Sequence, residues 1–245
     1  MEIKPTFDGF NLCVQNSVRL FEDGCTQQLS LPTVGALLEI GLEEAAKGFL
    51  ILICLERNEE DSSKTSIGLD KSLSDLITEV KGFSDKIDCQ KHMVTAFKEH
   101  KVKTNILNLF GNLFGSVSPE SITLKQYTKS FLKGLYPDIR GDFLEKYLSS
   151  PTVTNSISNH ITDIKGSLTK LSQKTKESGF YVDWTGSSFI YPEIDNNTIL
   201  RMAQILFSFI IVFRTLTESL QMKSQIKLDV SNLYEKLTAL RDRLK

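Results

Sequence analysis

Apolar residues recur at helical spacing along most of the chain. Residues 8–26 place apolar and small side chains on one face. The stretch from Ser30 to Arg57 is apolar nearly all round, which is typical of a helix buried on most sides. Ser30 is placed to cap that helix, and "DNNT" (195–198) is placed to cap a later one. The spacing predicts further helices over 69–82, 88–114, 123–134, 141–149, 158–176, 198–222 and 227–244.

One segment departs from the helical pattern. Residues 178–194, "SGFYVDWTGSSFIYPEI", are rich in aromatic and turn residues and predict a short extended or β-like segment near 180–192. Long helices with short connections elsewhere predict an all-α fold. We expect a single domain over residues 1–245, with a helical insertion at about 115–165, where the pattern becomes less regular after "GSVSPES".

Composition narrows the possible functions. The chain has 245 residues, of which 40% are hydrophobic and 24% charged, so it is long enough to bury a substantial core. Its formal net charge of -1 excludes an affinity for nucleic acid over the whole surface and leaves only local patches. The segments 49–55 and 205–213 are too short to span a membrane, and the first residues do not resemble a signal peptide. We therefore expect a cytoplasmic protein with no membrane partner.

The residues that usually bind metals or cofactors do not form a recognisable site. The 4 Cys include no C-x-x-C pair, so we predict reduced, mostly buried thiols and neither a zinc site nor a disulfide framework. The 3 His are not spaced as metal ligands, and the sequence contains no glycine-rich phosphate loop and no H-E-x-x-H motif. We expect no metal and no cofactor.

The second helix carries the first candidate site, in "LEIGLEEAAKGFL" (38–50). Glu44 falls on the apolar side and is expected to face inward, whereas Glu43 is expected to lie closer to water. Lys47 is three residues from Glu44 and four from Glu43, so both pairings are possible. An inward Glu–Lys pair is costly unless its polar atoms are fully partnered. The alternative is a surface pair on the one polar edge of the helix.

The second candidate site is in "AFKEHKVKTNIL" (96–107), where His100 and Lys103 share one helix face. An imidazole beside a cation can perform acid–base chemistry on a bound phosphate. The alternative is a core histidine next to a lysine that extends to solvent. Lys101 is expected to face another side of this helix. A basic stretch that ends at Lys176 leads into "GFYVDW" and can meet RNA phosphates and bases, or it is a solvated helix face.

Four motifs occur in an order that resembles the AbiV family of abortive infection proteins, within the HEPN superfamily of small all-α proteins. They are "QNSVRLFEDG", "EEAAK", "FKEHKVK" and "ESGFYVDWTG", and the resemblance covers roughly residues 8–110 and 165–215. It implies a HEPN-like helical bundle, a homodimer and an antiphage role in the bacterial cytoplasm. It also implies metal-independent cleavage of RNA (tRNA, mRNA or ribosomal), with a phage protein as a possible trigger.

The resemblance also implies roles for individual residues. His100 would be the general acid/base when a ribose 2′-OH attacks the adjacent phosphate, and Lys103 and Lys47 would stabilise the phosphate charge. Glu44 would orient that pair. The remaining positions are RNA-binding Lys101, Lys176, Tyr181 and Asp183, and the supporting residues Asn16, Asp23 and Glu43. HEPN ribonucleases usually carry an Arg four to six residues before the catalytic His, and no His in this sequence has one.

A different class of function fits the same sequence. A non-catalytic helical dimer that binds a phage or host protein would block phage development without cutting RNA. It predicts that His100→Ala still protects cells.

Overall fold

The computed structural model describes about half of the chain. Its long elements are α1 (Phe7–Gly24), α2 (Leu31–Asp61), α9 (Asn196–Ser219) and α10 (Val230–Arg243). The described residues are 6–26, 28–61, 103, 106–107, 129–134, 141, 183–184, 189–190, 194–219 and 228–245. They are mainly helical, which confirms the predicted all-α character.

Two short strands lie in the segment for which extended structure was predicted. β1 (Asp183–Trp184) pairs antiparallel with β2 (Phe189–Ile190), and Asp183 is opposite Ile190 in the register. The helices predicted at 69–82, 158–176 and most of those at 88–114 and 141–149 lie outside the described residues.

Side-chain caps fix where the helices begin. At the start of α9, Asp195 Oδ1 accepts a hydrogen bond from the Thr198 backbone N–H at 2.9 Å, as the motif "DNNT" predicted. A hydrogen bond from the Thr198 hydroxyl and, next in size, the one from its backbone N–H lower the pKa of the Asp195 carboxyl. The ends of the four long helices lie within about one turn of the predicted ones. The other caps are Thr6 for α1, Ser30 for α2 and Asp229 for α10.

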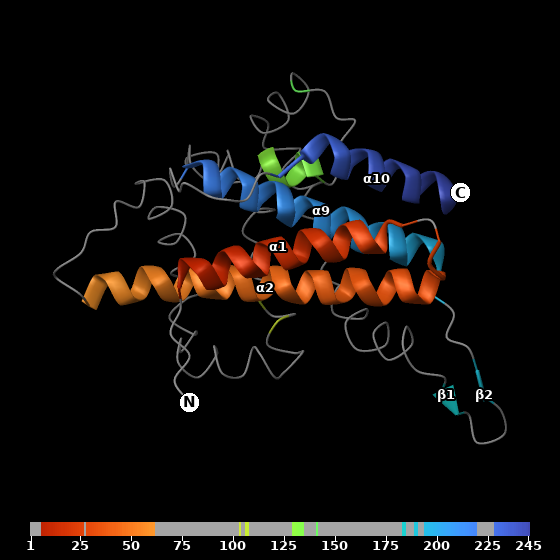
Figure 1. Ribbon diagram of the computed structural model, residues 1–245, viewed down its shortest axis with the longest axis horizontal. Helices are drawn as coiled ribbons and strands as arrows, with labels where there is room; N and C mark the ends of the chain where they lie inside the picture. The colour runs from red at the N-terminus through yellow and green to blue at the C-terminus, as the bar shows by residue number, and fades with distance from the viewer. Residues whose placement is uncertain are drawn as a thin grey trace, which may run out of the picture.

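α1 and α2 run antiparallel as a hairpin, and α9 packs against both (Figure 1). Aromatic rings carry much of this packing. The Phe213 ring of α9 lies 5.7 Å from Phe10 of α1 and 4.5 Å from Phe49 of α2, measured between ring centroids. Phe207, six residues earlier on α9, stacks on Phe21. α9 is therefore the central helix of the described core.

Residues 129–134 are helical and pack directly on α9. The Phe131 ring lies 5.5 Å from that of Phe209. A Cβ on Gly134 would lie 2.4 Å from Ser208 Cα, so this close approach of two helix backbones requires glycine. Part of the segment predicted as an insertion thus contributes to the core, and its status as an insertion stays a prediction.

Among the described helices, α9 is long and apolar enough to cross a membrane by length and composition. Within Asn196–Thr217, a stretch of 18 residues has a mean hydropathy of 1.8, and 67% of that stretch is buried in this fold. The central helix of a bundle has the same composition, because it is surrounded by apolar neighbours. One such helix does not by itself indicate a membrane protein, and the cytoplasmic location stays a prediction.

α10 returns along α9 (Figure 1), and polar contacts attach it to the α1–α2 hairpin. Lys236 Nζ lies 3.1 Å from Glu22 Oε1. Arg243 donates to the Thr26 carbonyl oxygen at 3.2 Å. These contacts hold the C-terminal helix on the side of α1 where the hairpin turns.

Candidate functional site

A buried ion pair joins α2 to the segment that carries the second candidate motif. Lys103 Nζ donates to Glu43 Oε2 at 2.6 Å, although the two residues are 60 positions apart in the chain. Glu43 is 8% exposed and Lys103 is 6% exposed. Charges are rarely buried so deeply unless they are paired. The contact brings residues of "EEAAK" and "FKEHKVK" together.

The expected orientation of Glu43 is wrong. We predicted that Glu43 would lie closer to water and that Glu44 would face inward, but Glu43 is the more buried of the two. The reason is that α2 is covered on most sides. Its apolar periodicity then does not single out one buried face, and the lysine that covers Glu43 comes from a distant segment.

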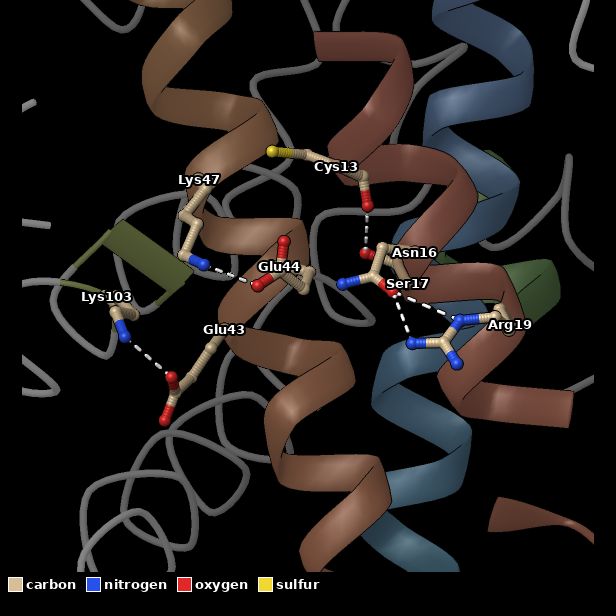
Figure 2. Close-up of polar contacts among 8 residues, drawn as sticks. All are labelled: Cys13, Asn16, Ser17, Arg19, Glu43, Glu44, Lys47 and Lys103. Carbon is tan, nitrogen blue, oxygen red and sulfur yellow. Dashed lines mark hydrogen bonds and ion pairs between the residues drawn. The ribbon is translucent and has the colours of Figure 1, made fainter. Parts of the chain in front are cut away.

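A second ion pair lies beside the first. Lys47 Nζ donates to Glu44 Oε1 three residues earlier, and their side chains are 15% and 14% exposed. Of the two pairings that the sequence left open for Lys47, this structure has the one with Glu44. Figure 2 shows the consecutive carboxylates diverging, with Glu43 reaching Lys103 and Glu44 reaching Lys47. We call these four residues the Glu–Lys cluster.

A cavity of about 530 Å³ opens beside the Glu–Lys cluster, between α1 and α2. Glu44 lines it from α2, and Asn16 and Arg19 line it from α1. Leu12, also in the wall, is 65% exposed. Among the described residues of the Glu–Lys cluster, Glu44 lines this cavity.

Arg19 connects two residues that the sequence analysis treated as supporting. Its Nη2 donates to Asn16 Oδ1 at 2.8 Å, and its Nη1 lies 3.7 Å from Asp23 Oδ2 (Figure 2 shows the bond to Asn16). Arg19 was not among the site residues predicted from the sequence. The signal that would have found it is the spacing in "QNSVRLFED", because residues three and four apart on a helix are neighbours.

Cys13 also lines the cavity but is not suited to act as a nucleophile. Burial and, to a lesser extent, the nearby Glu44 carboxylate together raise the pKa of its thiol to about 12, while Lys47 opposes this. The thiolate, which is the reactive form, is therefore scarce at neutral pH. Cys13, Cys25 and Cys54 are buried and reduced, as predicted, and Cys89 lies outside the described residues.

Comparison with known proteins assigns no family. No protein-family model, no curated protein and no solved structure matches this chain. The resemblance to the AbiV family and the HEPN superfamily therefore stays a prediction that rests on the four sequence motifs.

The structure places only some of the remaining predicted site residues. One that it places is Asp183, the first residue of β1, whose backbone pairs with that of Ile190. In the part of the chain that the structure describes, no group of three or more metal-ligating side chains comes together. The predicted residues that lie outside the described part are His100, Lys101, Lys176 and Tyr181.

The Glu–Lys cluster has a chemical property that a surface pair lacks. Glu43, Glu44 and Lys47 lie within little more than one turn of α2, Lys103 reaches Glu43 from a distant segment, and all four side chains are largely shielded from water. N–H donors held in such surroundings stabilise developing negative charge more strongly than solvated lysines do. A buried pair is a poor source of stability, because apolar residues of similar volume often do as well. Two adjacent pairs beside a cavity thus favour a functional role.

Proposed function

We propose that this protein is an antiphage abortive infection protein that cleaves RNA without a metal ion. The observation that carries the proposal is the buried contact between Lys103 and Glu43. It joins the "FKEHKVK" and "EEAAK" motifs, and Lys103 is only three residues beyond His100 in the sequence. The proposed reaction is attack of a ribose 2′-OH on the adjacent phosphate.

In this mechanism each residue has a distinct task. His100 removes the proton from the 2′-OH and later protonates the leaving 5′-oxygen, which is general acid–base catalysis. Lys103 and Lys47 stabilise the charge that develops on the phosphate. Glu43 and Glu44 hold these lysines in position, as the two ion pairs support. The cut leaves a 2′,3′-cyclic phosphate and a 5′-hydroxyl.

The cavity beside Glu44 is the proposed entry for the RNA backbone. Arg19 is charged and exposed at this cavity, and it is oriented by Asn16 and Asp23. A guanidinium group suits phosphate recognition because it presents several donors in one plane. The proposal includes a HEPN-like helical bundle, a homodimer and a cytoplasmic location. Light scattering tests the dimer directly, and a monomer mass would exclude a site shared across a two-fold axis.

One observation favours the non-catalytic alternative. Each lysine of the Glu–Lys cluster is matched by a carboxylate, so the cluster is balanced in charge. Such a charge-balanced cluster is sufficient for a helical dimer that binds a phage or host protein. In this alternative the ion pairs fix the packing of α2 and take no part in chemistry.

A phage challenge separates the two functions. Cells carrying wild type, His100→Ala or Glu44→Ala would be infected with a panel of phages, and both plaque number and RNA integrity would be measured. We expect wild type to reduce plaques and fragment RNA, and both variants to lose the two effects together. Lys245→Ala, at an exposed position of the C-terminus, is the matched control and should behave as wild type. Full protection by His100→Ala would support the non-catalytic alternative.

A further inference from the structure

The outer face of α1 carries a short pattern of exposed side chains. The pattern consists of Asp8, Leu12, Gln15 and Arg19, which follow one another at intervals of four, three and four residues. Because one residue turns an α-helix by about 100°, these side chains leave α1 within about 60° of one another. They therefore form one stripe along the helix, which we call the α1 stripe.

The centre of the α1 stripe is apolar on one side. Leu12 is 65% exposed, and it stands out in this respect from the other large apolar side chains that the structure describes. A single leucine on a surface is ordinary and does not by itself mark a contact. The arrangement of charge around it is what indicates a partner, because Asp8 lies one turn before Leu12 and Arg19 lies one turn after Gln15.

The α1 stripe is complementary to a second copy of itself. If two copies of α1 lie antiparallel, with a two-fold axis midway between Leu12 and Gln15, each Leu12 is opposite Gln15 of the partner subunit. Asp8 and Arg19 are equally far from that midpoint, so each Asp8 is opposite Arg19 of the partner subunit. The two Leu12 side chains are then only about 5 Å apart along the helix direction.

The charges select this orientation over the parallel one. A parallel pairing in register would place Asp8 opposite Asp8 of the partner subunit and Arg19 opposite Arg19 of the partner subunit, and like charges in contact are unfavourable. The antiparallel pairing instead forms one opposite-charge contact at each end of the stripe. Such exposed contacts contribute little affinity but determine orientation and specificity.

Arg19 has donors available for this contact. Its Nε and Nη2 are directed at Asn16 Oδ1, at 3.3 and 2.8 Å (Figure 2). Its Nη1 lies 3.7 Å from Asp23 Oδ2, which is too long for a direct hydrogen bond. Since a guanidinium carries five N–H donors, the two on Nη1 can serve the carboxylate of Asp8 of the partner subunit and a phosphate at the same time.

We propose that a second copy of this chain docks on the α1 stripe, with the two α1 helices antiparallel around a two-fold axis. Leu12, Gln15 and Arg19 also line the cavity beside Glu44, so the cavities of both protomers border this interface. The inference rests on the homodimer of the proposed function and names its contact surface. It does not depend on RNA cleavage.

Charge reversal in separate and mixed variants tests the pairing, with sedimentation equilibrium at low salt as the measurement. Asp8→Lys and Arg19→Asp each turn both end contacts into repulsions, and each should raise the Kd of the dimer about tenfold or more. In an equimolar mixture of the two variants, both end contacts of the mixed dimer again join opposite charges, so wild-type affinity should return. Lys245→Glu reverses an exposed charge away from α1 and should leave the Kd unchanged.

Circular dichroism checks that each variant folds. If a reversal unfolds the chain, Asp8→Asn and Arg19→Gln carry the test, and each should raise the Kd of the dimer about threefold or more. Equal Kd values for these variants and wild type would overturn the proposal as a failed rescue would.

The results separate this surface from the proposed function. A wild-type dimer whose reversed variants associate equally well, or a mixture that stays as weak as its components, overturns the α1 stripe and leaves the homodimer. A monomeric wild type overturns both. A chain that dimerises through the α1 stripe but cuts no RNA keeps this interface and refutes only the ribonuclease.

Discussion

Breaking the buried pair between Glu43 and Lys103 should have a large and specific effect on stability. The two side chains are 11% and 7% exposed, and their charged atoms lie 2.6 Å apart. At an effective dielectric constant of about 20 their Coulomb attraction is about 6 kcal/mol, and most of this only offsets the loss of hydration. Lys103→Met leaves the carboxylate buried without this ammonium, and we expect it to lower the free energy of unfolding by about 3–5 kcal/mol.

A double-mutant cycle isolates the interaction. Glu43→Leu together with Lys103→Met replaces the pair with apolar groups, and such replacements are often neutral. We expect the free energy of unfolding to fall less in the double variant than the sum of its decreases in the two single variants, by at least about 2 kcal/mol. Urea unfolding followed by circular dichroism gives each free energy from the midpoint and the slope.

An exposed pair at the C-terminus provides the control. Lys245 and Asp242 also form an ion pair, at 2.7 Å, but their side chains are 70% and 57% exposed. Water and salt screen such a pair, so Lys245→Met should leave the urea midpoint within experimental error. If Lys103→Met unfolds at the same urea concentration as wild type, the buried pair does not exist in solution and the reasoning fails.

Three further predictions concern helix packing, capping and the thiols. Gly134→Ala places a Cβ 2.4 Å from the α9 backbone and should lower thermal stability by about 1–3 kcal/mol, whereas Gly141→Ala, with nothing within 4 Å, should not. Asp195→Ala should cost about 1 kcal/mol at pH 7. The pKa of the Asp195 carboxyl is lowered from 3.8, so the stability difference between wild type and Asp195→Ala should be constant well above pH 3.8. Thermal melts in acid should show the difference shrinking as the pH falls below 3.8. Burial raises the pKa of Cys13 and Cys25 to about 12, so both thiols should react with a disulfide reagent at pH 8 only after unfolding; rapid labelling of the native chain would contradict their burial.

Much of the helical architecture could be predicted because its determinants are local. Apolar spacing marks the faces of α1 and α9, and caps such as Ser30 and Asp195 mark where helices begin. These signals act within a few residues of chain. They can therefore be recognised in the sequence without knowledge of what packs against each helix.

The partners within the candidate site could not be predicted in the same way. Glu43 and Glu44 are consecutive, and each faces a different neighbour because one residue turns an α-helix by about 100°. Their roles depend on Lys103, which the fold brings from 60 positions away.

RNA cleavage in EDTA is the most direct test of the central claim, which is that the Glu–Lys cluster and His100 form a ribonuclease site. Purified wild type, His100→Ala, Glu44→Ala and Lys245→Ala would each be incubated with tRNA, mRNA and ribosomes, and the ends of the products would be determined. The account predicts cleavage by wild type and Lys245→Ala, with 2′,3′-cyclic phosphate ends, and a loss of about a hundredfold or more in His100→Ala and Glu44→Ala. Equal cleavage by wild type and His100→Ala, or no cleavage by wild type, would contradict it.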